Sequence, residues 1–117
     1  MHIVYGIANC DTTQKALKWL DKHKVNYEFY DHKKQEITAD KLKRWCKQVG
    51  WEKILNRKSA TYRELDDAAK QSLTNEKAAI QMMRKNASII KRPVIEMDGH
   101  IAIVGFDEKE YQKNFGR

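Results

Sequence analysis

The sequence predicts an α/β fold in which a mixed β-sheet is flanked by helices and interrupted by an inserted helical block. Three observations support this prediction. A strand–helix–strand pattern fills the N-terminal part, the residues from about 38 to 86 show helical patterns without strands, and a hairpin pattern followed by a helix ends the chain. At 117 residues the chain fits a single domain (1–117) whose core needs no disulfide bonds.

The N-terminal part reads as a β–α–β unit. Residues 2–5 form a short apolar run of the β type, and Ala16 and Leu20 recur at helical spacing in a helix expected over about 12–23. Residues 25–30 then alternate apolar and polar side chains, as a half-buried strand does. Two strands joined through one helix are expected to lie parallel with a right-handed crossover.

The helical block opens with a capping pattern. Thr38 is placed as an N-cap, and Ile37 and Leu42 are spaced for a hydrophobic staple. The helix that follows is expected to run to Val49 and to stop at Gly50, because glycine readily takes the conformation that ends a helix.

The remainder of the block is less regular. Residues 51–57 are too short and mixed to assign, whereas Thr61 and Glu64 have the spacing of a capping box before a brief helix. A further helix is expected over about 75–85.

The C-terminal part predicts a hairpin and a last helix. Apolar runs at 93–97 and 100–104 flank Asp98-Gly99, a dipeptide that favours a two-residue hairpin turn. The helix start carries a cap, a capping-box glutamate and a hydrophobic staple, namely Asp107, Glu110 and the pair Phe106 and Tyr111.

Composition and charge narrow the function classes. The formal net charge is +7, but the 23 basic residues are interleaved with 16 acidic ones, and no zinc-finger or RNA-binding signature occurs. We therefore expect a solvated basic surface and no direct nucleic-acid binding. The four histidines are scattered without ligand spacing, so we expect no metal.

The apolar runs and the first residues indicate the compartment. No apolar run approaches the roughly 20 residues that span a bilayer, and the first residues lack the regions of a signal peptide. We expect a cytoplasmic monomer that does not bind membranes.

The two cysteines receive different interpretations. Cys10 follows the first strand and its turn and precedes a helix, where unpaired N–H groups and the helix dipole favour a nucleophilic thiolate. Thr13 stands where a Cys-x-x-Cys pair would have its second sulfur, so a reactive Cys10 would need an external resolving thiol. The alternative for Cys10 is a small buried side chain, which is our interpretation of Cys46 on the apolar face of its helix beside Trp45.

Four segments carry a resemblance to a known family: residues 6–12, 50–57, 89–94 and 104–106, which include the pieces Asn-Cys-Asp-Thr and Lys-Arg-Pro-Val. Over nearly its whole length the chain resembles the arsenate reductase (ArsC) family, and within it the YffB-like or Spx-related branch. The resemblance implies a thioredoxin-like fold with a helical insertion.

The resemblance also implies roles for individual residues. Cys10 would be the thiol of the active-site loop, and Arg92 would precede a cis proline, Pro93, although from the sequence alone a cis bond is the minority outcome. Arg92 would lower the pKa of the Cys10 thiol and bind a carboxylate or an oxyanion. Arg57 matches a second anion contact of the family, with a solvated helix end as the alternative. The other candidate substrate contacts are Asn9, Thr12, Thr13, Lys15 and Pro93. Lys15 is as compatible with a solvated position.

These residues predict an ArsC-like thiol oxidoreductase that forms a mixed disulfide at Cys10. Glutathione is the expected co-substrate, with its carboxylates at Arg92 and Arg57, and no cofactor is expected to be bound. One alternative is an Spx-like protein that contacts RNA polymerase or another acidic surface through the basic helical block. Arsenate reduction is a weaker alternative, because arsenate reductases carry a third arginine after the hairpin, where this chain has residues 104–107, Val-Gly-Phe-Asp.

Overall fold

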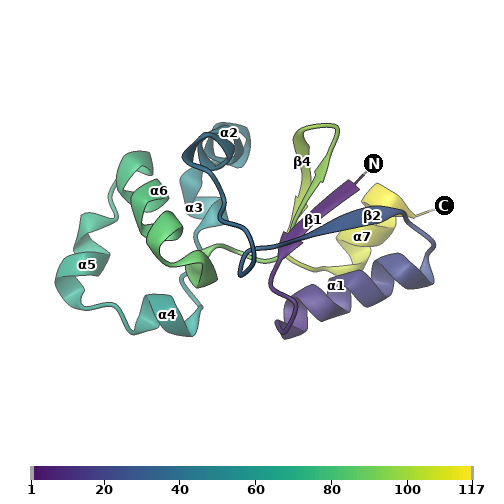
Figure 1. The fold of residues 1–117 in the computed structure, drawn as a ribbon, viewed down its shortest axis with the longest axis horizontal. Helices are drawn as coiled ribbons and strands as arrows, with labels where there is room; N and C mark the ends of the chain where they lie inside the picture. The colour runs from purple at the N-terminus through teal and green to yellow at the C-terminus, as the bar shows by residue number, and fades with distance from the viewer. Residues whose placement is uncertain (1, 117) are drawn as a thin grey trace. The chain divides into compact units, whose positions relative to one another are not determined.

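The computed structural model describes residues 2–116, which form two compact units. The sheet unit comprises the residues up to Gln35 and those from Arg92 onward, and the helical unit is Glu36–Lys91. Figure 1 shows the elements of each unit in the order of the chain. The helical block predicted over about 38–86 therefore lies inside a slightly longer unit.

The sheet unit contains a four-stranded sheet in the order β2-β1-β3-β4. Its strands are β1 (His2–Gly6), β2 (Tyr27–Asp31), β3 (Val94–Met97) and β4 (His100–Val104). β1 and β2 are parallel with Val4 opposite Phe29, whereas β1 and β3 are antiparallel with Val4 opposite Ile95. The predicted mixed sheet and the parallel β–α–β pairing are confirmed.

One face of this sheet packs against the helices α1 (Asp11–Lys22) and α7 (Glu108–Phe115) (Figure 1). Apolar residues recur along one side of each helix, so that both helices bury a stripe against the strands. The buried core cluster consists of Val4, Ala16, Trp19, Leu20, Val25, Ile95, Ile103, Tyr111 and Phe115.

The opposite face of the sheet carries a buried polar pair. The Tyr5 hydroxyl donates a hydrogen bond of 2.9 Å to Glu96 Oε1. The Tyr5 ring also contacts the Tyr30 ring on the neighbouring strand, with a centroid distance of 4.8 Å. These contacts tie β1 to both of its neighbours through side chains as well as through the backbone.

The hairpin turn, and the N-cap and staple of the last helix, follow the sequence prediction. Asp98 and Gly99 have φ values of 53° and 81°, as the two central residues of a type I′ turn require. The Asp107 carboxylate accepts hydrogen bonds from the first turn of α7, and the rings of Phe106 and Tyr111 contact each other at 4.8 Å.

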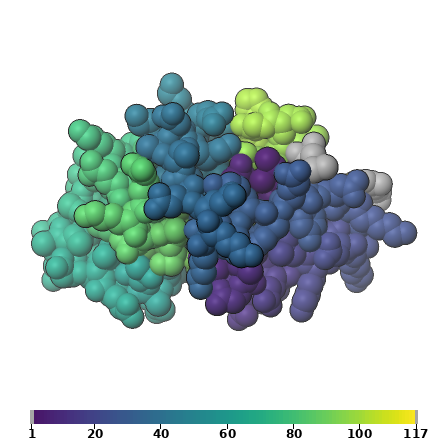
Figure 2. Space-filling model, in the orientation of Figure 1, coloured from purple at the N-terminus to yellow at the C-terminus, as the bar shows by residue number. Residues whose placement is uncertain are grey.

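The helical unit contains five α-helices and one 3₁₀ turn within the described residues. They are α2 (Ala39–Val49), α3 (Trp51–Ile54), α4 (Ala60–Arg63), α5 (Asp67–Ser72), α6 (Glu76–Lys85) and η1 (Ala87–Ile89). α2 packs against α3 and α6 through fully buried side chains that include Trp45, Ile54 and Met83. In Figure 2 side chains fill the space that the ribbons leave open among α4, α5 and α6.

The helix ends in this unit confirm two predicted signals. The Thr38 hydroxyl accepts the Lys41 N–H at 3.1 Å, and Gly50 ends α2 with a φ of 90°. The predicted helix over 75–85 is confirmed as α6, with Asn75 as its N-cap. Cys46 is buried, as its place on the apolar face predicts.

The predicted capping box at Thr61 is wrong. Ser59 is the N-cap of α4, because its hydroxyl accepts the Tyr62 N–H at 3.1 Å. Thr61 lies inside the helix, and its hydroxyl instead forms a 2.7 Å hydrogen bond with Ser88.

Candidate functional site

Cys10 occupies the N-cap position of α1, where β1 has turned into the helix. The Cys10 N–H donates to the Ile7 carbonyl at 3.0 Å, and the Cys10 carbonyl accepts the Gln14 N–H at 2.9 Å. The thiol is partly exposed and makes no capping hydrogen bond as a neutral group. The sulfur therefore lies at the end of the helix where backbone N–H groups lack intrahelical partners.

The surroundings of Cys10 lower its pKa. Partial burial acts in the opposite direction, because removing a thiolate from water is unfavourable. Hydrogen bonds from the Thr13 N–H and hydroxyl, the positive charge of Arg92 and the Thr12 N–H together outweigh the effect of burial. The site thus favours the nucleophilic form of the thiol.

Thr13 supplies two of these hydrogen bonds from a fully buried position. Its hydroxyl has no conventional hydrogen-bond partner among the described residues. The buried hydroxyl can thus donate a hydrogen bond to the sulfur of Cys10. This hydrogen bond is strongest when the sulfur is a thiolate. Thr13 stands where a Cys-x-x-Cys pair would have its second sulfur. It therefore acts on Cys10 as a hydrogen-bond donor and not as a resolving thiol.

Arg92 and Pro93 enter the sheet unit at the start of β3 and are joined by a cis peptide bond. The Pro93 carbonyl accepts the Gly105 N–H at 2.7 Å, which fixes this segment to the end of β4. Arg92 is half-buried, and its charge acts on Cys10. The structure thus brings the predicted pair of Cys10 and Arg92 into one electrostatic environment.

His32 belongs to the same environment, although sequence reasoning gave it no role. It is only 5% exposed, its main-chain N–H donates to the Gly6 carbonyl at 2.9 Å, and neither ring nitrogen has a hydrogen-bond partner of ordinary geometry among the described residues. Burial and then the charge of Arg92 lower the pKa of His32 to about 4, against smaller opposing effects of the Tyr5 main chain and Asp31. His32 is therefore a neutral buried imidazole at neutral pH.

The other predicted contacts of the loop lie at the surface. Asn9 is exposed, and its side-chain oxygen accepts a long hydrogen bond of 3.4 Å from the Lys33 ammonium. Thr12 is exposed in the first turn of α1. Lys15 is exposed one turn further along and lines a groove between α1 and α7.

Arg57 belongs to the helical unit. It is exposed, and its guanidinium lies 5.8 Å from the centre of the Trp51 ring, a cation–π distance. Its role in anion binding stays a prediction.

Two kinds of feature are absent from residues 2–116. No group of three or more His, Cys, Asp and Glu side chains is arranged to hold a metal ion. No helix in this part of the chain has the length and apolar character needed to cross a membrane.

Comparisons with known proteins agree with this architecture. An uncharacterized protein of Haemophilus influenzae is 42% identical over 115 residues, which are 98% of this chain and 99% of that protein. The global transcriptional regulator Spx of Streptococcus pyogenes is 29% identical over 112 residues, which are 93% of this chain and 81% of that protein.

Solved structures show the same fold. The YffB protein is 45% identical and superposes with a TM-score of 0.90, covering 97% of this chain and 98% of that chain. An arsenate reductase (ArsC) related protein from Brucella melitensis is 39% identical with a TM-score of 0.79, covering 99% and 95%. The sequence model of the ArsC family matches residues 5–114. The chain therefore belongs to the ArsC family and has its thioredoxin-like fold.

Proposed function

We propose that this protein is a glutathione-dependent thiol oxidoreductase in which Cys10 is the nucleophile. The observation that supports this most directly is the lowered pKa of a partly exposed thiol at a helix N-terminus, beside Thr13 and Arg92. A thiolate at neutral pH attacks disulfides, whereas a thiol does not. Membership of the ArsC family supports the same class of chemistry.

The proposed cycle balances with two molecules of glutathione for each disulfide reduced. The Cys10 thiolate attacks one sulfur of the substrate disulfide, forms a mixed disulfide and releases the other half as a thiolate, which takes up a proton. A glutathione thiolate then attacks the substrate sulfur of this mixed disulfide, which regenerates the Cys10 thiolate and leaves the substrate bonded to glutathione. A second glutathione releases the substrate thiol and forms glutathione disulfide.

Thr13 at the second position of the Cys-x-x-Cys spacing is the reason for an external resolving thiol. The chain provides no second cysteine in this loop. Its other cysteine, Cys46, is buried in the helical unit. Burial, and to a smaller extent the charge of Glu76, raise the pKa of Cys46 to about 11. In the proposed complex Arg92 pairs with a glutathione carboxylate.

A coupled assay tests this proposal. Reduction of the mixed disulfide of glutathione and 2-mercaptoethanol is followed through glutathione reductase for the wild type, Cys10→Ser and Cys46→Ala. Cys10→Ser should lose activity and Cys46→Ala should keep it. Full activity in Cys10→Ser would contradict the proposal, and arsenate-dependent oxidation of glutathione would favour the arsenate reductase alternative instead.

A second candidate function is regulation of transcription through protein contacts. It is favoured by the 29% identity to relatives named global transcriptional regulator Spx. A stoichiometric complex with purified RNA polymerase that survives Cys10→Ser would support this candidate, because such a contact does not need the thiol. Absence of any complex would leave the thiol chemistry as the sole proposal.

A further inference from the structure

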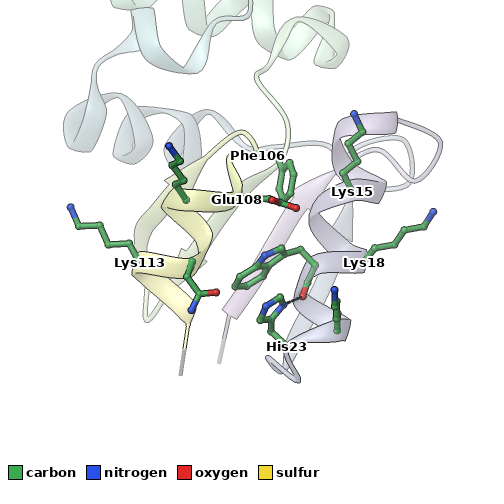
Figure 3. Close-up of a pocket in the computed structure, with 10 residues that line it drawn as sticks. Lys15, Lys18, His23, Phe106, Glu108 and Lys113 are labelled. Carbon is green, nitrogen blue, oxygen red and sulfur yellow. Dashed lines mark hydrogen bonds between the residues drawn. The ribbon is translucent and has the colours of Figure 1, made fainter.

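An open groove of about 1060 Å³ runs between α1 and α7 on the outer side of the sheet unit. Cys10 and Arg92 do not line it, and the thiol chemistry proposed above makes no use of it. Figure 3 shows Lys15 and Lys18 extending from α1 on one side of the groove and Lys113 extending from α7 on the other. Phe106 and Glu108 lie between them.

The walls of the groove are strongly basic. Five exposed lysines line it against a single carboxylate, that of Glu108: Lys15, Lys18 and Lys22 on α1, and Lys109 and Lys113 on α7. The spacings of three and four residues place each set along one side of its helix. No ion pair joins any of the five ammonium groups to another residue in the range 2–116.

The floor of the groove is aromatic and already packed. Trp19 is buried, and its ring stacks on the His23 ring at 3.8 Å with an angle of 14°. His23 is held there because its Nδ1 lies 2.9 Å from the Trp19 carbonyl (Figure 3). Phe106 is half-buried against Tyr111 and leaves part of its ring at the groove. The partly exposed Phe106 ring therefore offers an apolar contact to a side chain of a partner.

We propose that this groove is a docking site for an acidic segment of another protein, with carboxylates at the lysines and an apolar side chain on the floor. Opposite charges on two surfaces speed their association and select the partner. α1 lines the groove from Lys15 to Lys22, and at 1.5 Å per residue this stretch offers a partner about 10 Å of groove.

Two features favour a protein segment over a nucleic acid. A single strand of nucleic acid needs aromatic faces on which its bases stack, and one face of Trp19 is covered by His23 in a buried position. The Glu108 carboxylate also lies within the groove, where it would repel a continuous row of phosphates, whereas a peptide can place an uncharged residue beside it. A second copy of this chain is disfavoured, because each copy carries a net charge of +7.

Phage display of a random 16-residue peptide library on the full-length protein tests this proposal. We expect peptides rich in Asp and Glu with one or two apolar residues, and we use the most enriched one, synthesised with a fluorescent label, for titration. A charge-reversed variant, Lys18→Glu/Lys22→Glu/Lys113→Glu, should bind it about tenfold more weakly or worse. Cys10→Ser should bind it as the wild type does, which separates docking from thiol chemistry.

The matched control reverses three exposed cations in the helical unit, Lys43→Glu/Arg44→Glu/Lys47→Glu. It changes the net charge by the same amount and should leave peptide binding intact. Equal losses in both variants, or a selection without acidic peptides, would overturn the proposal. Tighter binding of a single-stranded oligonucleotide that the groove variant weakens would also overturn it, in favour of a nucleic-acid site.

Discussion

Gly6 and Thr13 approach each other so closely that a Cβ atom at Gly6 would lie 2.8 Å from Thr13 Oγ1 and 2.9 Å from its Cγ2. Gly6 is the last residue of β1, and Thr13 is fully buried in the first turn of α1. The absence of a side chain at Gly6 therefore allows the hydroxyl that acts on Cys10 to sit where it does.

We predict that Gly6→Ala destabilises the protein by about 1–3 kcal/mol, the usual cost of overpacking a filled site. The displaced Thr13 hydroxyl should also raise the pKa of Cys10. Urea unfolding and the pH dependence of alkylation measure the two effects. In the double variant Gly6→Ala/Thr13→Ala the clash is removed, so much of the stability should return while the pKa of Cys10 stays raised; additive losses of stability would contradict this account.

The Thr13 hydroxyl itself is tested by Thr13→Val, which keeps the branched shape and removes the donor. The pKa of Cys10 should rise, because the thiolate loses a hydrogen bond while the backbone N–H groups remain. Mass spectrometry of iodoacetamide adducts as a function of pH measures it, and Cys46 serves as an internal reference because burial raises its pKa to about 11. Thr13→Ser is the control and should keep the lowered value; an unchanged pKa in Thr13→Val would show that the hydroxyl has no part in it.

The sequence could predict those features of the site that depend on residues close together in the chain, and not those that depend on contacts between distant segments. Cys10 follows a strand and precedes a helix, so its place at a helix N-terminus could be predicted from neighbours in the chain, as could the caps Thr38 and Asp107. His32 lies in a polar loop with two lysines after it, and nothing local indicates burial. Its position depends on the pairing of β2 with β1, through the hydrogen bond to Gly6.

The errors in the helical unit have the same origin. Ser59 and Thr61 are both acceptable N-caps, and Ser59 is the one used because its hydroxyl also donates to the Asn56 carbonyl at 2.9 Å. α5 was not predicted, because Asp67–Ser72 buries no side chain and so lacks a hydrophobic period. The only sequence pattern that indicates such a short polar helix is its N-cap residue, Asp66, whose carboxylate accepts the Ala69 N–H.

Arg92 acts on two titratable groups at once, which gives a coupled prediction. Removing its charge in Arg92→Gln should raise the pKa of Cys10, which loses an attractive charge, and the pKa of His32, which loses a repulsive one. Alkylation measures the first and ¹³C or ¹⁵N NMR of the imidazole measures the second. Arg92→Lys keeps the charge and should move both less; a change at only one of the two groups would mean that they do not share this neighbour.

His32 should make the stability of the fold sensitive to mild acid. Its pKa is about 4 in the folded protein and about 6.5 when unfolded, so at a pH between these values the unfolded chain binds the additional proton. The contribution of His32 to the free energy of unfolding is complete above pH 6.5 and is lost as the pH falls toward 4, by up to about 3 kcal/mol in total.

Urea unfolding of the wild type and of His32→Gln across this range isolates the effect, because the carboxylates are common to both proteins. The difference in unfolding free energy between the two should shrink steadily from pH 7 to pH 4, whereas a constant difference would mean that His32 is not held neutral by its surroundings.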